Sequence, residues 1–379
     1  MNIACLGYGV VGQGVVELLK KDDRFHVSWI LVKDLNECNL PEATTDVHQI
    51  LNDEQIDLVI EMMGGIEFPF FCISESLKRG KHVVTSNKAV MQAHYQTLIE
   101  LAQQNHVKLG MEASVGGGIP WITTLLSLSQ TGEINHVEGI FNGTTNYILD
   151  RMHKEHLDFD AILKDAQRLG YAEADPSDDI DGKDSLRKLM LSSSIAFQTI
   201  TDMDSFTSES LRNIKSCDIE AFERKGLRCR YLASAVKEGN GVSGSVEPTL
   251  FQSTDVQSTV ALNNNLALLN HSALGTLQLI GQGAGRYPTA NAVVQDVIQI
   301  FNGRLDLPRI IHNVETQSSL QATRLYVRAS LQALDQIEHW LDEKEENTGW
   351  TKFISQDEKK QLLEKVMELD SDFFYAIIK

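Results

Sequence analysis

The sequence predicts an α/β protein, in which a doubly wound parallel sheet is followed by an α+β domain with an antiparallel sheet and by a small α+β tail. Three observations predict this class. Short apolar strands alternate with amphipathic helices over roughly the first 115 residues. Longer strands separated by glycine turns replace that alternation further along the chain. Five short segments of strand and helix pattern then complete it.

The N-terminal elements follow the order expected of a parallel sheet. Residues 2–21 predict an apolar strand, a glycine turn and a helix, because apolar side chains recur at helical spacing after the turn. A helix at about 286–305 is expected to complete this domain, which otherwise spans 1–134. Further strands are predicted within 27–34, 57–65, 81–90 and 107–114, and further helices within 48–55, 70–80 and 94–106.

The pattern changes after Ser114. A glycine-rich turn leads to a helix start near Pro120, and residues 134–152 begin as a strand that turns at Asn142-Gly143. Residues 227–251 predict two strands joined by a hairpin loop at Gly239-Asn240-Gly241. We therefore predict an α+β domain over 135–285.

The tail is predicted over 318–379. Its last helix is amphipathic and precedes an apolar strand, so the tail is expected to bury a small core of its own. The predicted order is strand, helix, strand, helix and strand, within 323–330, 331–344, 349–355, 356–370 and 372–379.

Composition and charge narrow the function. The chain has 379 residues, of which 42% are apolar and 23% charged, and a formal charge of −18. That charge disfavours nucleic acid and anionic membrane as partners and favours a small-molecule substrate. No apolar run approaches the roughly 20 residues that span a bilayer, and no signal peptide is evident, so a cytoplasmic location is expected. Five scattered cysteines, without a C-x-x-C pair, predict reduced and mostly buried thiols.

A glycine motif lies between the first predicted strand and helix. Gly7-Tyr-Gly9-Val-Val-Gly12 permits a tight turn, close approach of a pyrophosphate and close helix packing, which is typical of a Rossmann-type dinucleotide site. A tight structural turn is the alternative. The second strand ends in Lys33-Asp34, where Asp34 would suit the 2′-hydroxyl of NAD and Lys33 the 2′-phosphate of NADP. We favour NADP, with NAD possible and two plain surface charges as the other interpretation.

An acidic stretch, EADPSDDIDGKDSLRK, covers residues 173–188. Asp184 and Lys188 are four residues apart at the start of an apolar helix, so they share one face. A partly buried lysine beside a carboxylate can perform general acid/base chemistry, whereas an exposed pair would be worth only about 0.3–0.5 kcal/mol. The other carboxylates do not follow the spacing of a calcium-binding EF-hand loop, and a solvated or helix-capping loop is expected for most of them.

Seven segments together resemble the homoserine dehydrogenases, in family order over roughly residues 3–305. They are Gly7-Tyr-Gly-Val-Val-Gly12; Ser86-Asn-Lys88-Ala; Glu112-Ala-Ser-Val-Gly-Gly-Gly-Ile119-Pro; Gly139-Ile-Phe-Asn-Gly-Thr-Thr-Asn-Tyr147; Gly170-Tyr-Ala-Glu173-Ala-Asp-Pro; Asp184-x-x-x-Lys188; and Gly283-Ala-Gly285-x-x-Pro-Thr289. The resemblance implies reversible reduction of L-aspartate 4-semialdehyde to L-homoserine by NAD(P)H, in threonine and methionine biosynthesis. It also implies a substrate-binding and dimerisation role for the second domain, and a homodimer or homotetramer.

The resemblance also implies site residues. Lys188 looks like the acid/base lysine and Asp184 like its partner, with Lys88 as a second lysine that could carry the proton. In the reduction, a lysine ammonium would give a proton to the semialdehyde oxygen. In the reverse direction the lysine must be neutral, so homoserine oxidation is expected to favour alkaline pH. The implied substrate ligands are Glu173, Asp179 and Lys88; the cofactor ligands are Gly7, Gly9, Val10, Val11, Gly12, Lys33, Met63, Gly64, Lys88 and Gly283; and the ligands of a monovalent cation such as sodium are Glu112, Val115, Gly117 and Ile119.

The tail departs from the family pattern. The order of its strands and helices looks like that of a degenerate ACT-type regulatory domain. The turn after its first strand, however, lacks Pro and Gly, so inhibition by threonine is not expected. A tail that serves dimerisation or is purely structural is the alternative. The sequence leaves two alternative functions. An aspartate-semialdehyde dehydrogenase needs a cysteine nucleophile in a glycine- or asparagine-rich turn, which no cysteine provides. A non-catalytic nucleotide sensor would not need Glu173, Asp184, Lys88 and Lys188 together.

Overall fold

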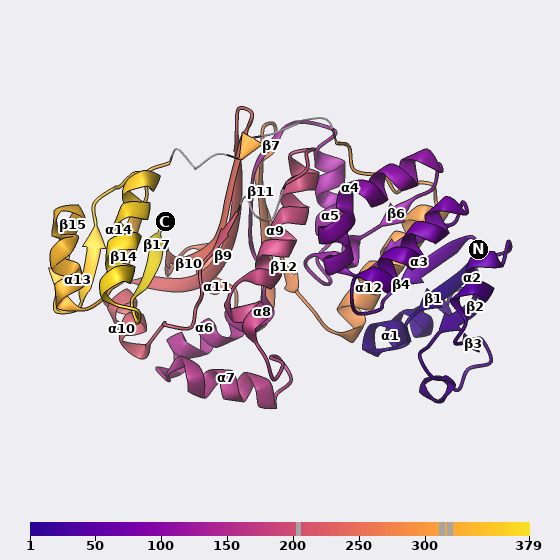
Figure 1. Ribbon diagram of the computed structural model, residues 1–379, viewed down its shortest axis with the longest axis horizontal. Coiled ribbons are helices and arrows are strands. Elements are labelled where there is room, and N and C mark those ends of the chain that lie inside the picture. The colour runs from indigo at the N-terminus through magenta and orange to yellow at the C-terminus, as the bar shows by residue number, and fades with distance from the viewer. Residues whose placement is uncertain (202–205, 311–314, 317–320) are drawn as a thin grey trace. The chain divides into compact units, whose positions relative to one another are not determined.

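The computed structural model describes residues 1–201, 206–310, 315–316 and 321–379, the last two of these ranges being parts of the C-terminal region (Figure 1). Their contacts divide the chain into two units. The first holds the described residues of Met1–Asn135, Met190–Thr201 and Asn270–Asn313, and the second those of His136–Leu189, Asp202–Leu269 and Val314–Lys379.

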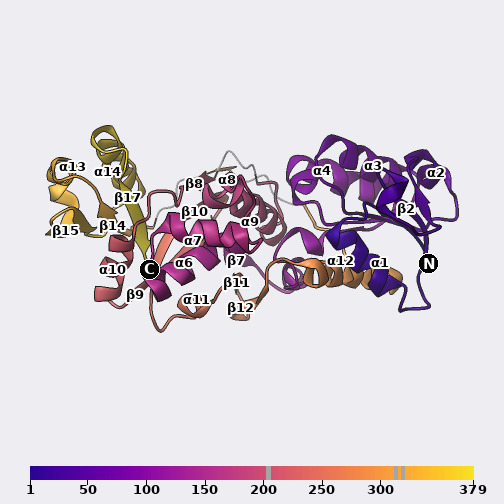
Figure 2. The ribbon, with the colours of Figure 1, turned by 90° about the horizontal axis from the view of Figure 1, so that it is seen from below.

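The first unit contains the predicted parallel sheet. Its strand order is β3-β2-β1-β4-β5-β6, with every pairing parallel, which is the order of the Rossmann fold. In Figure 2, α1 and α12 lie on one side of this sheet and α3 and α4 on the other. The strands are β1 Asn2–Leu6, β2 His26–Leu31, β3 Ala43–Thr44, β4 Leu58–Glu61, β5 His82–Thr85 and β6 Leu109–Gly110; the helices are α1 Val10–Leu19, α2 Val47–Asn52, α3 Glu67–Lys78, α4 Lys88–Gln104, α5 Trp121–Leu128 and α12 Arg286–Phe301.

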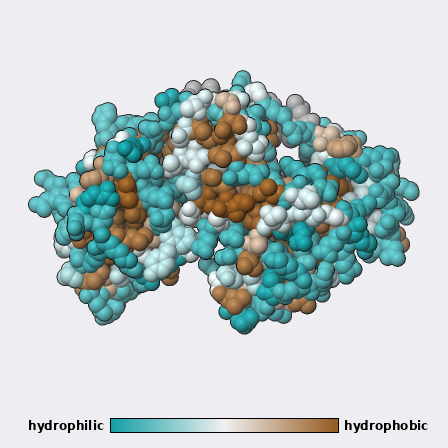
Figure 3. Space-filling model, turned by 180° about the vertical axis from the view of Figure 1, so that it is seen from behind, coloured by the Kyte–Doolittle hydropathy of each residue, from teal (hydrophilic) through white to brown (hydrophobic). Residues whose placement is uncertain are grey.

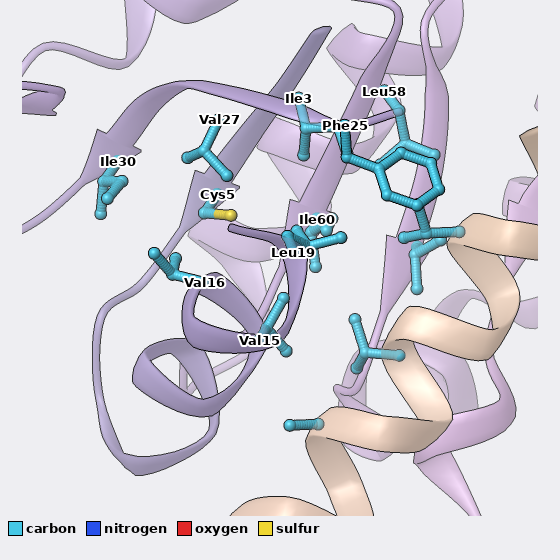
Figure 4. Close-up of a cluster of buried hydrophobic side chains, with 14 of the residues drawn as sticks. Ile3, Cys5, Val15, Val16, Leu19, Phe25, Val27, Ile30, Leu58 and Ile60 are labelled. Atoms are coloured by element: carbon cyan, nitrogen blue, oxygen red, sulfur yellow. The ribbon is translucent and has the colours of Figure 1, made fainter. Parts of the chain in front are cut away.

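A segment from late in the chain completes the core of this unit. Ala290, Val293 and Val297 of α12 pack with residues of α1, β1 and β2, and all are buried. Figure 4 shows Ile3, Cys5, Val15 and Leu19 among the side chains of this cluster. The prediction of a helix near 286–305 is therefore confirmed.

Two predicted strands of the first unit are shorter than expected. The strand predicted within 107–114 is paired only at Leu109–Gly110, and Glu112–Ser114 form a 3₁₀ turn. The strand predicted within 81–90 ends at Thr85, since the Asn87 side chain accepts hydrogen bonds from two N–H groups of the next turn and starts α4 at Lys88. In the second place a polar side chain therefore ends the strand by starting a helix.

The second sheet contains eleven strands among the described residues. Its order is β12-β11-β7-β9-β10-β17-β14-β16-β15, with β13 and β8 pairing with β10. The predicted hairpin is confirmed, since β9 and β10 pair antiparallel from Leu227↔Gln252 to Glu238↔Gly241. The strands are β7 Ile134–Ile140, β8 Thr207–Ser208, β9 Leu227–Glu238, β10 Gly241–Gln252, β11 Asn264–His271, β12 Gly275–Gln282, β13 Glu315–Thr316, β14 Arg324–Arg328, β15 Leu341–Glu345, β16 Thr348–Thr351 and β17 Phe374–Ile378.

The helices of this region begin with the predicted turn at Asn142-Gly143, after which α6 starts. They are α6 Gly143–Glu155, α7 Phe159–Arg168, α8 Ser177–Ile180, α9 Lys183–Ala196, α10 Ser216–Arg224, α11 Val256–Thr259, α13 Leu331–Gln336 and α14 Gln356–Leu369. Helix α6 packs against β9, and its His153 accepts a hydrogen bond from the Cys229 N–H.

The tail has its predicted small core, built around Leu325, Leu334, Trp340, Leu362 and Tyr375. It is continuous with the second sheet, because β17 pairs in parallel with β10. The helix predicted within 331–344 ends at Gln336, and Leu341–Glu345 instead form β15 against β16. Here pairing with a neighbouring strand prevails over helix propensity. The likeness of this tail to an ACT domain stays a prediction.

The surface is mixed in polarity, and the cysteines are unpaired. Figure 3 shows one face that is mostly hydrophilic, with apolar residues gathered in separate patches. Within the described part of the chain, no helix is long and apolar enough to cross a membrane. All five cysteines are free thiols; Cys217 is exposed and the others are buried, as predicted.

Candidate active site

The glycine loop of the first unit is shaped by close contacts. A Cβ on Gly12 would lie 2.4 Å from the Gly7 carbonyl oxygen, and Gly7 itself has φ +99°. Neither position tolerates a side chain without rearrangement. Gly9 differs, since a Cβ there would meet nothing within 4 Å. Beyond it Val10 begins α1 with 67% of its surface exposed, so the start of this helix is open to solvent, and a helix N-terminus is a place where phosphates can bind.

The end of β2 places the two candidate ribose ligands differently. Lys33 is exposed. Asp34 is exposed as well, but its Oδ1 accepts hydrogen bonds of 2.9 Å from both the backbone N–H and the side-chain amide of Asn36. One oxygen of the residue that would favour NAD is thus engaged in a local turn.

A buried network holds the loop that carries Met63 and Gly64. Glu61 accepts hydrogen bonds from the Thr85 hydroxyl at 2.6 Å and from the Met63 N–H at 2.7 Å. Asn87 donates to the carbonyls of Met63 and Gly65 while it caps α4. Burial raises the pKa of Glu61, and these hydrogen bonds oppose that rise. The roles of Glu61 and Asn87 were not predicted from the sequence, although Asn87 lies in one of the family-like segments.

Lys88 is the first residue of α4 and is half-buried. A lysine side chain beside the N-terminus of a long helix makes a positively charged place, since the helix end adds a partial positive charge. Such a place suits an anionic group of a cofactor or substrate.

The segment predicted to hold a monovalent cation is a tight glycine turn. Gly117 has φ +59°, and a Cβ there would lie 2.3 Å from the Gly283 carbonyl carbon, so Gly117 and Gly283 are in close contact. Among the described residues, no backbone N–H donates to the carbonyl oxygens of Val115 or Gly117. The Ile119 carbonyl, by contrast, accepts from the Trp121 N–H at 2.8 Å.

Glu112 takes a structural part in the same segment. Its two carboxylate oxygens accept hydrogen bonds from the N–H groups of Ile122 and Thr123, at 2.8 and 2.7 Å, and so cap α5. Burial raises the pKa of Glu112, and these hydrogen bonds oppose the rise. No group of three or more His, Cys, Asp or Glu side chains suited to a metal occurs in the described ranges. The Glu112 carboxylate is thus already engaged, and the other oxygens considered in this turn are main-chain carbonyls.

The second unit brings the candidate proton-transfer residues together. Asp184 and Lys188 lie one turn apart on α9, and Lys188 Nζ donates to Asp184 Oδ2 at 2.8 Å. Nζ also donates to the Phe141 carbonyl at 2.6 Å. Both side chains are buried, with 9% of Lys188 and 4% of Asp184 exposed. The exposed ion pair considered from the sequence is thus excluded, because an exposed pair would not be desolvated in this way.

Asp179 joins this group through Asn142. The Asn142 amide nitrogen donates to Asp179 Oδ1 at 2.7 Å and to Asp184 Oδ2 at 3.0 Å. Burial raises the pKa of Asp179; the hydrogen bond from Asn142 opposes that rise, and the negative charge of Asp184 adds to it. Asn142 lies in one of the family-like segments, but no role was predicted for it from the sequence.

The remaining carboxylates of the acidic stretch divide as expected. Asp178 pairs with Arg187 at 2.6 Å, Asp181 pairs with Arg212 at 2.8 Å, and Asp175 accepts from the Ser177 N–H at the start of α8. They are salt-bridged or capping groups. Glu173 is exposed, and its backbone carbonyl accepts a hydrogen bond from the Gln167 side chain.

Comparison with known proteins gives a consistent result. The family described as "Homoserine dehydrogenase, NAD binding domain" matches residues 7–112, and that described as "Homoserine dehydrogenase" matches residues 120–298. The chain is 33% identical over 362 residues to the homoserine dehydrogenase of Bacillus subtilis, covering 89% of this chain and 84% of that protein. It is 38% identical over 318 residues to that of Synechocystis sp., covering 79% and 73%.

Solved structures agree with these sequence matches. A homoserine dehydrogenase from Thiobacillus denitrificans matches with a TM-score of 0.90 at 27% identity, covering 100% of this chain and 98% of that one. A hyperthermophilic archaeal homoserine dehydrogenase in complex with NADPH shares the fold, with a TM-score of 0.70 at 22% identity over 81% of this chain and 99% of that one.

Proposed function

The chain belongs to the homoserine dehydrogenase family, and from this premise we propose how its residues perform the family's reaction. It is an oxidoreductase that reversibly reduces L-aspartate 4-semialdehyde to L-homoserine with a nicotinamide cofactor. The observation that carries the proposal is the buried Lys188–Asp184 pair, held to the Phe141 carbonyl.

We assign the transferred proton to Lys188. The glycine loop of the first unit would hold a reduced nicotinamide cofactor, which when bound would supply the hydride for the aldehyde carbon. The Lys188 ammonium then donates a proton to the developing alkoxide, while Asp184 and the Phe141 carbonyl hold the amine in place. In the reverse direction the amine must first be neutral to accept the proton of the homoserine hydroxyl, so oxidation is expected to be faster at alkaline pH.

Substrate binding is assigned to Asp179, Glu173 and Lys88. The substrate carries an ammonium group, and carboxylates are its natural acceptors. Asp179 shares Asn142 with Asp184, which supports its placement beside the reacting end. Glu173 lies on an exposed loop and is proposed for the ammonium on the strength of the family motif alone. Lys88 suits the substrate carboxylate, the alkoxide or a cofactor phosphate, because it begins a helix.

For the cofactor we propose NADP, with NAD as the alternative. The glycine loop at Gly7, Gly9 and Gly12, with Val10 and Val11 in the first turn of α1, offers N–H donors to the pyrophosphate. Lys33 is exposed for a 2′-phosphate, whereas Asp34 is engaged with Asn36. The loop at Met63 and Gly64, Lys88 and Gly283 complete the proposed contacts. If Lys33→Ala slows NADPH and NADH turnover equally, Lys33 does not read the 2′-phosphate.

We further propose that the turn at Glu112, Val115, Gly117 and Ile119 binds a monovalent cation such as sodium. The carbonyls of Val115 and Gly117 support this, since no described backbone N–H uses them. Glu112 would contribute through its main chain, because its carboxylate caps α5. A homodimer or homotetramer and a cytoplasmic location remain predictions, the first of which light scattering can check.

Substitution of each lysine tests the proton assignment. Lys188→Met keeps a buried unbranched side chain and removes the amine, so turnover in both directions should fall about 10²–10⁴-fold while cofactor affinity is kept. Lys88→Met is the matched comparison. A Lys188→Met enzyme with near-normal turnover, together with an inactive Lys88→Met enzyme, would transfer the proton role to Lys88.

A further inference from the structure

Residues Phe141 and Asn142 form the junction between β7 and α6, and both contact the proton-transfer pair. The Phe141 carbonyl accepts from Lys188 Nζ at 2.6 Å and also from the Asn265 amide at 2.9 Å. The Asn142 amide donates to Asp184 Oδ2 at 3.0 Å. Two consecutive residues therefore hold both ends of one ion pair that lies more than 40 residues away in sequence.

Asn142 has a second, separable role as the cap of α6. Its Oδ1 accepts from the Thr145 N–H at 2.8 Å, which fixes the start of the helix. Serine and aspartate cap helices about as well as asparagine. The cap therefore requires only the side-chain oxygen, and it leaves the amide N–H₂ unexplained.

The N–H₂ group is used entirely on carboxylates. One hydrogen bond goes to Asp179 and the other to Asp184, and Asn142 itself is buried, with 4% exposed. Two carboxylates that share one donor group lie close together, where their charges repel. The groups that face Asp179 are Asp184 and Lys188 of α9, Asn142 of the β7–α6 junction and Thr144 of α6. Lys188 is the cation among them, and Asn142 is the donor that bridges both acids.

We propose that Asn142 is a positioning residue for the reaction: its amide aligns Asp184 with Lys188 and keeps Asp179 as an acceptor for the substrate ammonium. This rests on the proposed roles of Lys188 and Asp179. Asn142 touches neither the reacting atoms nor the cofactor in this account. It acts through the two carboxylates, and it does so from a place fixed by the helix it caps.

The test replaces the amide and keeps the cap. Asn142→Ser retains an oxygen for the Thr145 N–H and loses both donors to the carboxylates. We expect kcat/KM for semialdehyde reduction to fall at least about 10- to 100-fold, which corresponds to the loss of one hydrogen bond to a charged group, since Asn142→Ser removes two such bonds. The dissociation constant of homoserine, measured by calorimetry, should rise about tenfold or more, and that of NADPH should not change. The acid limb of the kcat/KM profile should move to higher pH, since Asp179 without its donor takes up a proton more readily.

A second variant, Asn142→Asp, and a control substitution at another helix cap complete the experiment. Asn142→Asp keeps shape and cap but adds a third carboxylate, so it should lose more activity than Asn142→Ser. Ser355→Asn exchanges one capping residue for another at the start of α14 and should behave as wild type. Wild-type homoserine affinity and an unshifted pH profile in a folded Asn142→Ser enzyme would overturn the proposal. If Asn142→Ser does not fold, a fully active Asn142→Asp would overturn it instead. Failure of the wild type to bind homoserine would count against the proposed function, not against Asn142 alone.

Discussion

The buried histidine of α6 should make the second unit sensitive to mild acid. His153 has no exposed side-chain surface; Cys229 N–H donates to its Nε2, and its Nδ1 faces Glu223 at 3.1 Å. Burial lowers the pKa of His153 from 6.5 to about 4; the hydrogen bond to Glu223 opposes this, and the charge of Arg230 adds to it. The ring is therefore neutral in the folded protein and gains a proton more readily on unfolding.

The sign and size of the effect follow from that difference. Because the folded pKa lies below the unfolded one, stability is complete above pH 6.5 and is lost as the pH falls toward about 4. One pKa unit corresponds to about 1.36 kcal/mol, so the full loss is about 3 kcal/mol, and about 2 kcal/mol of it should appear by pH 5.

Urea unfolding at pH 7.5 and pH 5 measures this directly. His153→Gln cannot gain a proton, so between the two pH values its free energy of unfolding should fall by about 2 kcal/mol less than that of the wild type. His48→Gln, at an exposed position, is the matched control and should follow the wild type. Other titrating groups are common to all three proteins and cancel in the comparison. Identical pH dependence in wild type and His153→Gln would refute the reasoning.

Three further predictions concern glycines and the tail. Gly12→Ala should lower the free energy of unfolding by more than about 2 kcal/mol, because its Cβ would overlap the Gly7 carbonyl. Gly9→Ala should change the free energy of unfolding by less than about 1 kcal/mol and raise KM for the cofactor about tenfold. Equal stability of the two variants would contradict this prediction. Gly117→Ala should be less stable than Gly80→Ala in urea unfolding, because both glycines have positive φ, at about 1 kcal/mol each, but only Gly117 also lies against Gly283. Arg328→Leu should lower the free energy of unfolding by about 3–5 kcal/mol in the same assay, since it leaves Asp218 buried without its cation. Lys344→Ala, at an exposed ion pair, should lower it by less than about 1 kcal/mol. A similar loss of stability in both variants would show that the burial of Asp218 is unimportant.

The sequence predicted those parts of the fold and site that depend on local pattern. The glycine loop, the alternation of strands and helices, the long hairpin and the tail's own core all follow from spacings within about 30 residues. The Asp184–Lys188 pair belongs to the same class, since a separation of four on a helix is sufficient to bring the two side chains together.

The missed features depend on contacts between distant segments. Asn142 reaches Asp184 across 42 residues, and the Phe141 carbonyl reaches Lys188 across 47. Glu61 and Thr85 meet only because their strands are neighbours in the sheet. The prediction of a helix over 331–344 was wrong in its second half, because the sequence pattern of that half gave no sign that it pairs with β16. In each case the contact joins residues that a pattern of local sequence spacing does not connect.

The contribution of α12 to the N-terminal core bears on how the chain folds as it is made. The face of β1 and β2 that α1 only partly covers also packs on Ala290, Val293 and Val297, some 260 residues later in the sequence. At about 5–20 residues per second, a ribosome takes roughly 10–50 s to supply that distance. Throughout this interval an apolar sheet surface lacks its native cover, so it is an evident target for a chaperone. A nascent chain halted before residue 286 should accordingly be more sensitive to protease in its first domain than one halted well beyond residue 301.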